Sequence, residues 1–224
     1  ATATVSFNVS GKTPNLWNAE TGEISPLGYQ FKEGRTLVPL DFKSWDAVFV
    51  VFQDQTTEQS LSLSRPVKLT ERILSGTWTL DIDEKSKELL QLKSWTDSED
   101  TKYFSGTALY TQTFNQKKRI KEGEKYVLQF HRINNIAEVV LNGKNLGAIW
   151  KKPYEIDITS ALKKGNNELQ ISVTNTWVNR LIGDAQPDVQ EKMTFTTMPF
   201  YKKDADLPPS GLIGPIKMVV YAEK

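Results

Sequence analysis

Apolar and polar residues alternate with a period of two along much of this chain. The alternation is clearest at residues 78–82, 126–131, 168–174 and 216–221, where every second side chain is apolar. Successive side chains of a β-strand point to opposite faces, so this pattern predicts strands that bury one face. Since nearly every periodic segment has this period, we predict an all-β fold.

Turn signals separate the predicted strands. Asn142-Gly143 favours a two-residue hairpin, because both central residues of a type I′ turn have positive φ. Glu33-Gly34 and Gly165-Asn166-Asn167 also predict turns. Antiparallel strands joined by frequent turns are typical of a sandwich or a barrel.

Two short segments carry helical signals. The first is Glu84–Leu90. The second is Ser160–Lys164, which follows Thr159, and a threonine hydroxyl at that position can cap the first turn of a helix. We expect short helices at both places.

A polar stretch divides the chain. Residues 54–64 are rich in Ser, Thr and Gln, and Arg65-Pro66 follows them. We therefore expect a small β unit over residues 1–60 and a larger one over residues 66–224. In the small unit the run Val48–Phe52 is continuously apolar, which predicts a strand buried on both faces. The strands expected in the small unit are residues 4–9, 29–31, 36–42 and 47–52.

The amino-acid composition argues against several classes of function. The 224 residues carry a net charge of +1, so there is no electrostatic signature of a nucleic-acid partner. Cysteine is absent, and no apolar run approaches the roughly 18 residues of a membrane span. A neutral partner such as a carbohydrate fits this balance. The sequence starts at Ala1 without a leader, so we expect any targeting signal to lie outside it.

Catalytic and metal-binding chemistry is sparse in this sequence. His131 is the single histidine and stands in the middle of a predicted strand, so no Ser-His-Asp triad can be assembled. Asp81 and Asp83 could offer oxygens to a structural Ca²⁺ ion, but two ligands are too few for a site, and we expect no cofactor or metal. Glycosidases use pairs of carboxylates, but we interpret the candidates as solvated loop residues. They are Asp81, Asp83, Asp157, Asp184, Asp188, Asp204 and Asp206.

The most informative stretch is residues 103–184. Residues 137–147 read Ala-Glu-Val-Val-Leu-Asn-Gly-Lys-Asn-Leu-Gly, and residues 154–167 contain Tyr-Glu-Ile-Asp-Ile-Thr followed by Gly-Asn-Asn. This order resembles the sugar-binding jelly roll of β-galactosidase and β-glucuronidase relatives in glycoside hydrolase family 2. With Asn179–Asp184, Ser210–Pro215 and parts of residues 9–52, the chain also resembles the C-terminal region of family 106 α-L-rhamnosidases.

The resemblance implies a galactose-binding-like antiparallel jelly roll over residues 66–224, preceded by the small β unit. It also implies that the catalytic carboxylates of the parent enzyme lie in a separate barrel, so that this chain is not an enzyme by itself. The Asn142-Gly143 hairpin and the Asp157-Ile158-Thr159 turn are interpreted as parts that build the fold rather than contact a ligand, because Asp157 and Thr159 can accept hydrogen bonds from the following turn.

A carbohydrate would be gripped by aromatic rings with hydrogen-bonding groups beside them. The main candidates are Trp150, Tyr154, Trp177, Arg180 and Asp184, and the rings of Phe200 and Tyr201 are two further candidates. The alternative interpretation is that both tryptophans pack in the core or between domains and that Arg180 and Asp184 form a structural ion pair. Residues 184–212 form a long excursion, and long loops often carry function.

Three functions remain open. The favoured one is a non-catalytic accessory region, structural or sugar-binding-like, of a bacterial glycoside hydrolase acting on plant or host glycans. The others are an autonomous carbohydrate-binding module and a protein-interaction β-sandwich of an envelope assembly. The expected partners are a carbohydrate or the catalytic domain of the parent chain, and the expected location is periplasmic or extracellular.

Overall fold

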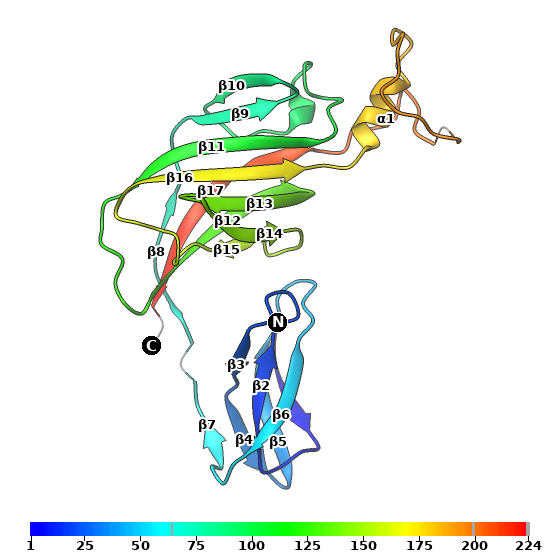
Figure 1. Ribbon diagram of the computed structural model, residues 1–224. Coiled ribbons are helices and arrows are strands. Elements are labelled where there is room, and N and C mark those ends of the chain that lie inside the picture. Colours follow the sequence, from blue (N-terminus) through cyan, green and yellow to red (C-terminus); the bar gives the residue numbers. More distant parts are fainter. Residues whose placement is uncertain (64, 199, 223–224) are drawn as a thin grey trace. The chain divides into compact units, whose positions relative to one another are not determined.

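The computed structural model describes residues 1–222 apart from Ser64 and Pro199. The chain forms two compact units, Ala1–Pro66 and a second that begins at Val67. Strands dominate both units, which confirms the all-β prediction (Figure 1). None of the helices in the described part of the chain is long and apolar enough to cross a membrane.

The first unit contains two small antiparallel sheets with strand orders β1-β5-β4-β7 and β3-β2-β6. Their apolar faces enclose Tyr29, Val38 and Leu40, and Phe7 meets Phe52 edge to face with ring centroids 5.2 Å apart. The strands are β1 (Thr2–Phe7), β2 (Lys12–Trp17), β3 (Ile24–Pro26), β4 (Tyr29–Lys32), β5 (Arg35–Asp41), β6 (Phe49–Gln55) and β7 (Ser60–Leu61).

One prediction for this unit is wrong. The run Val48–Phe52 is not buried on both faces: none of its residues is buried, and Phe49 is 62% exposed. Strand β6 pairs with β2 and lies at the edge of its sheet among the described strands, so it has no neighbour on its other side. The predicted Glu33-Gly34 turn is confirmed, with φ of 51° and 75° between paired Lys32 and Arg35.

The second unit is an antiparallel sandwich of a six-stranded sheet, β10-β9-β11-β16-β13-β14, and a four-stranded sheet, β15-β12-β17-β8 (Figure 1). The strands are β8 (Val67–Ile73), β9 (Trp78–Ile82), β10 (Lys85–Leu89), β11 (Thr107–Gln116), β12 (Glu124–Asn134), β13 (Ile136–Leu141), β14 (Lys144–Ile149), β15 (Glu155–Asp157), β16 (Gly165–Thr174) and β17 (Gly211–Ala222). A 3₁₀ helix, η1 (Trp95–Asp97), and a short helix, α1 (Val178–Asp184), complete the unit.

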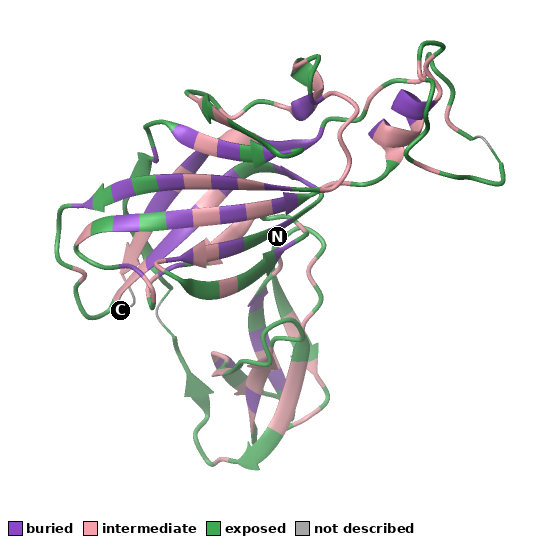
Figure 2. Cartoon of the chain, turned by 45° about the horizontal axis from the view of Figure 1, so that its top comes forward, coloured by how far each residue is buried: buried purple, intermediate pink, exposed green. Residues whose placement is uncertain are grey.

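Period-two burial builds the core of the sandwich. Along β16 the residues Leu169, Ile171 and Val173 are fully buried, whereas Glu168 and Thr174 are exposed. Figure 2 shows the same alternation as coloured bands along several strands. Leu128 and Met218 bring the opposite sheet into the same core cluster, so the predicted strand faces meet between the two sheets.

Both predicted helices are wrong. Glu84–Leu90 is strand β10, because Asp83 and Glu84 adopt positive φ of 51° and 59° and close a two-residue hairpin after β9. Ser160–Lys164 holds only a turn. Thr159 does not cap a helix: its Oγ1 accepts a hydrogen bond from the backbone N–H of Tyr126 at 2.8 Å.

The Asn142-Gly143 hairpin is confirmed, with φ of 52° and 81°. Asn142 Nδ2 donates to Asn167 Oδ1 at 2.8 Å, and Asn142 Oδ1 accepts from the N–H of Glu168 at 3.1 Å. Asn167 is completely buried and bonds three backbone groups of Lys163 and Gly165. These side chains complete the fold, as predicted, and we call this part of the sandwich the Asn167 end.

Candidate functional site

The opposite end of the sandwich carries the predicted site. Strand β16 ends there at Thr174 and leads into α1, and residues 185–210 follow as a long excursion before β17 begins (Figure 1). Ile136 at the start of β13 pairs with Thr174, and Ile149 at the end of β14 pairs with Ala137. Trp150 and Trp177 therefore follow strands that finish at the same end, which we call the α1 end.

Two asparagines hold the two ends of the excursion together. Asn175 Nδ2 donates to the carbonyl of Phe104 at 2.9 Å and to Ser210 Oγ at 3.1 Å. Asn179 is buried, and its Nδ2 donates to Ser210 Oγ at 2.7 Å and to the carbonyl of Pro208 at 3.0 Å. Because Ser210 is the last residue of the excursion, these bonds fix where it leaves and where it returns.

Close packing seats α1 on the sandwich. A Cβ atom on Gly183 would lie 2.7 Å from Tyr103 Cβ, so the helix touches this ring as closely as a glycine allows. Gly211 has φ of 81°, and a Cβ atom there would lie 2.4 Å from Trp95 Nε1. Both contacts need glycine, and they place the helix and the start of β17 against loop residues 95–103.

The buried hydroxyl of Tyr110 accepts hydrogen bonds at the base of the excursion. Tyr110 on β11 is fully buried, and its Oη accepts from Trp95 Nε1 at 2.6 Å and from the N–H of Leu212 at 3.2 Å. Burial raises the pKa of Tyr110 to about 12. The base of the excursion is therefore closely packed and hydrogen-bonded, with the Oδ1 of Asn179 as a buried exception that has no partner among the described residues.

The two candidate tryptophans are solvent-exposed within this chain. Trp150 is 59% exposed and Trp177 is 61% exposed. The alternative that they pack in the core is wrong, because Trp150 follows the outermost strand of its sheet and Trp177 precedes α1 beyond the end of β16. Lys151 Nζ lies 5.8 Å from the centroid of the Trp150 ring, a cation–π contact that places a positive charge beside it.

The other three candidates differ from one another. Tyr154 is half-buried and packs against the core. Arg180 is half-buried, and its backbone N–H donates to Ser105 Oγ at 3.2 Å. The structure thus brings Trp150 and Trp177 to one end of the sandwich as exposed rings, while Tyr154 belongs largely to the fold.

The predicted ion pair between Arg180 and Asp184 is not found among the described residues. Asp184 is buried, and its Oδ2 instead accepts hydrogen bonds from the N–H of Thr194, at 2.7 Å, and from the Thr194 hydroxyl. Asp184 therefore anchors the excursion, as the ion-pair interpretation proposed, but through a residue of the excursion itself. It is also an exception to the expectation that the carboxylates are solvated. The other six, Asp81, Asp83, Asp157, Asp188, Asp204 and Asp206, are exposed.

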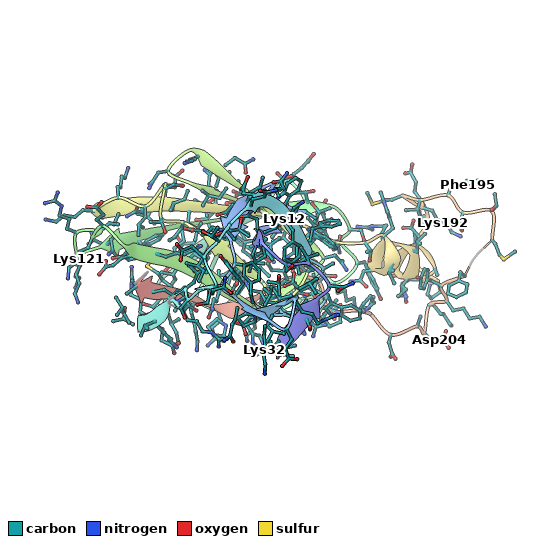
Figure 3. The ribbon with its side chains drawn as sticks, turned by 90° about the horizontal axis from the view of Figure 1, so that it is seen from below. Lys12, Lys32, Lys121, Lys192, Phe195 and Asp204 are labelled. Atoms are coloured by element: carbon teal, nitrogen blue, oxygen red, sulfur yellow. The ribbon has the colours of Figure 1, made fainter. Side chains whose placement is uncertain are left out.

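The sequence-based site named Phe200 but missed the other three highly exposed apolar residues of the excursion. Met193, Phe195, Met198 and Phe200 are 69%, 88%, 76% and 80% exposed. They lie on the excursion, which projects beyond the sandwich, as the labels of Lys192, Phe195 and Asp204 show (Figure 3). The sequence does contain a signal for this apolar surface. Residues 193–201 form an uncharged run rich in Met and Phe, between Lys192 and Lys202.

Other chemistry is limited. Among the described residues no group of three or more His, Asp or Glu side chains could hold a metal ion, and His131 is exposed. A pocket of about 370 Å³ lies between segments 73–76, 90–92 and 214–216, and it contains none of the five predicted site residues.

Comparison with known proteins gives consistent matches. The sequence profile described as "Glycosyl hydrolase 2 galactose-binding domain-like" matches residues 87–203, more than half of the chain. The structure of a rhamnosidase from Novosphingobium sp. PP1Y is 40% identical over 98% of this chain, with a TM-score of 0.89. A curated relative from Formosa agariphila, named "Putative beta-glucuronidase", is 37% identical over 68% of the chain.

These matches confirm the resemblance to rhamnosidase- and glucuronidase-related proteins that the sequence motifs predicted. The chain spans 22% of the rhamnosidase and 16% of the Formosa relative. The profile, together with the sandwich and its Asn-Gly hairpin, shows that the chain belongs to the glycosyl hydrolase 2 galactose-binding domain-like family.

Proposed function

We propose that this chain is a non-catalytic accessory region of a larger, secreted α-L-rhamnosidase-like glycoside hydrolase, located in the periplasm or outside the cell. The supporting observation is the match to the rhamnosidase, which covers 98% of this chain but only 22% of that protein. In this proposal the catalytic acid and nucleophile come from the remaining part of the parent chain.

The carboxylates of this chain support the proposal. Hydrolysis of a glycosidic bond generally needs two carboxyl groups facing each other across the bond, commonly 5–10 Å apart as a rough guide. Asp184 is buried and occupied by Thr194, and Asp157 is an exposed turn residue whose Oδ1 accepts from the N–H of Thr159. A general acid at neutral pH uses a raised pKa. Desolvation raises the pKa of Asp157, but its hydrogen bonds to Thr159 and the nearby charge of Lys125 together hold it below the usual value.

A direct assay tests this proposal. The isolated chain is incubated at high concentration with aryl α-L-rhamnosides and aryl β-galactosides, and the full-length parent enzyme serves as the positive control. We expect turnover from the parent enzyme alone. Turnover by the isolated chain that disappears when one of its own carboxylates is replaced would refute the non-catalytic assignment.

A second function, sugar binding at the α1 end, is favoured by the exposure of Trp150 and Trp177, and by Lys151 Nζ, which lies 5.8 Å from the centroid of the Trp150 ring. Exposed indole rings can stack on the apolar faces of sugar rings. If the chain acts as a carbohydrate-binding module, L-rhamnose or a rhamnose-containing oligosaccharide should quench its tryptophan fluorescence. Trp150→Ala and Trp177→Ala should weaken the effect, whereas Trp45→Ala, at an 85% exposed tryptophan of the first unit, should not. Binding that is lost equally in all three variants would argue against a site at the α1 end.

A further inference from the structure

The tip of the excursion is an apolar surface that this chain leaves uncovered. Met193, Phe195, Met198 and Phe200 are each at least 69% exposed. Large apolar side chains that are exposed together in a soluble protein commonly mark a contact site. Of these four residues, Phe200 alone was a candidate in the sequence-based site.

The excursion is held by specific bonds below the tip. Thr194 is bonded to the buried carboxylate of Asp184. Gln186 Nε2 donates to the carbonyl of Lys203 at 2.9 Å and to that of Ile182 at 3.1 Å. The bond to Lys203 connects the outgoing segment of the excursion to the segment that returns to β17. Phe200 meets Tyr201 edge to face, with centroids 5.2 Å apart. These contacts present the apolar side chains outward in a defined place, which lowers the entropy cost of binding a partner.

The chemistry of the tip fits a protein surface better than a sugar. Residues 193–201 contain no charged or amide side chain. The Thr194 hydroxyl donates to Asp184, so the side-chain polar groups that are left are the hydroxyls of Thr196, Thr197 and Tyr201. A site that selects a polyhydroxylated ligand needs several placed polar groups, whereas aromatic and methionine side chains are enriched at the cores of protein interfaces.

We propose that the tip, residues 193–198 and Phe200, docks against the catalytic portion of the parent chain, with Phe195 and Phe200 as its anchors. This inference rests on the proposed function. The occupant follows from the length of the matched rhamnosidase, of which this chain covers 22%, so most of such a protein lies outside the region described here. A partner on the same chain is present at high effective concentration, so a small apolar patch suffices to hold it.

A photo-cross-linking experiment in the full-length parent enzyme tests the contact. Phe195→p-benzoylphenylalanine is irradiated, and the cross-linked peptides are identified by mass spectrometry. We expect cross-links to peptides of the catalytic portion. Cross-links only to a second copy of the protein, or only within residues 1–224, would overturn the proposal, as would the absence of cross-links.

A pair of substitutions separates docking from folding. Phe195→Ser combined with Phe200→Ser should leave the melting temperature of the isolated chain unchanged, because both rings are exposed in it. In the parent enzyme the same change should lower the melting temperature. Lys192→Ser, at an exposed charged residue of the same excursion, is the matched control and should have little effect in either protein.

Failure of the docking proposal can be distinguished from failure of the proposed function. If the parent enzyme hydrolyses no glycoside, the proposed function fails whatever the cross-links show. If the parent enzyme is an active glycosidase, but the double substitution changes neither melting temperature and Phe195 cross-links nowhere in the catalytic portion, the docking proposal fails alone.

Discussion

The two ends of the sandwich use polar and aromatic residues in opposite ways. At the Asn167 end, the amides of Asn142 and Asn167 bond to each other and to the backbone of the turns around them. Asn167 is fully buried, and both its oxygen and its nitrogen are satisfied within the chain. The loops at this end thus satisfy the hydrogen bonds of these two amides within the chain.

At the α1 end, polar side chains at the base of the excursion are also hydrogen-bonded within the chain, although the Oδ1 of Asn179 is buried without a partner among the described residues. Asn175, Asn179 and Tyr110 are engaged by backbone and side-chain groups around them, but Trp150, Trp177 and Phe195 remain more than half exposed. Polar residues in the turn motifs therefore stabilise the fold, whereas aromatic rings that the chain leaves exposed are available to a ligand or to another part of the parent protein. The sharpest tests of this contrast replace two residues of the same type, one buried and hydrogen-bonded and the other exposed, and compare the changes in stability.

The largest expected effect is at the Asn167 end. Asn167→Ala removes a side chain that accepts from Asn142 Nδ2 and from the N–H of Lys163, and that donates to the carbonyls of Lys163 and Gly165. These groups would lose their partner in a part-buried network around the fully buried Asn167, so we expect the free energy of unfolding to fall by about 3–5 kcal/mol. Urea denaturation followed by tryptophan fluorescence measures the change.

Asn115→Ala is the matched control for this prediction. Asn115 is exposed on β11, and its Nδ2 donates to Asn166 Oδ1 at 2.8 Å. Replacing it should change the free energy of unfolding by no more than about 0.5 kcal/mol. Equal losses in the two variants would show that the buried network contributes nothing beyond an exposed hydrogen bond.

An intermediate effect is expected at the base of the α1 end, in alkaline solution. Burial raises the pKa of Tyr110 to about 12, from the ordinary value of 10.0. Above pH 10 the unfolded chain therefore releases this proton before the folded chain does, so stability falls as the pH rises from 10 towards 12. The full loss corresponds to roughly 2–3 kcal/mol.

Urea denaturation of the wild type and of Tyr110→Phe between pH 8 and pH 11 measures this dependence. The variant starts from lower stability, because Trp95 Nε1 and the N–H of Leu212 lose their acceptor, but its decline above pH 10 should be shallower. The raised pKa of Tyr126, about 12, contributes to both proteins equally. Parallel curves for wild type and variant would show that Tyr110 ionises with equal ease in both states.

Local signals explain the parts of the fold that the sequence predicts well. The strands β9, β12, β16 and β17 follow from alternation alone, and the Asn142-Gly143 hairpin follows from residues that tolerate positive φ. Strand β10 was missed for the converse reason. Asp83 and Glu84 occupy the positive-φ positions usually taken by Asn and Gly, so the sequence shows no turn there, and residues 84–90 resemble a polar helix.

The candidate site is harder to read, because it depends on contacts between distant residues. Helix α1 has seven residues and is seated by the contact of Gly183 with Tyr103, which no local pattern of residues 177–184 reveals. Asp184 has Arg180 one turn away, yet it bonds Thr194 of the excursion. The sequence predicts that Trp177 lies beyond the end of strand β16, where the structure has it, but it could not tell an exposed ring from a buried one.

The smallest expected effect is that of Trp177→Ala on stability. Trp177 is 61% exposed before the first turn of α1, whereas Trp95, at the same end of the sandwich, is 2% exposed and its Nε1 is hydrogen-bonded to Tyr110. Removing the exposed ring should change the free energy of unfolding by no more than about 0.5 kcal/mol. Trp95→Ala, the matched substitution in the core, should lower it by about 3–5 kcal/mol.

Urea denaturation of the two variants, followed by far-UV circular dichroism to avoid the change in tryptophan signal, gives both values. A loss above about 1 kcal/mol for Trp177→Ala would mean that the ring packs within this chain, since surface substitutions rarely cost that much. The expected near-zero value would instead leave Trp177 available to a sugar or to the rest of the parent enzyme. Weaker association of Trp177→Ala with either one, at unchanged stability, would then show which of the two it contacts.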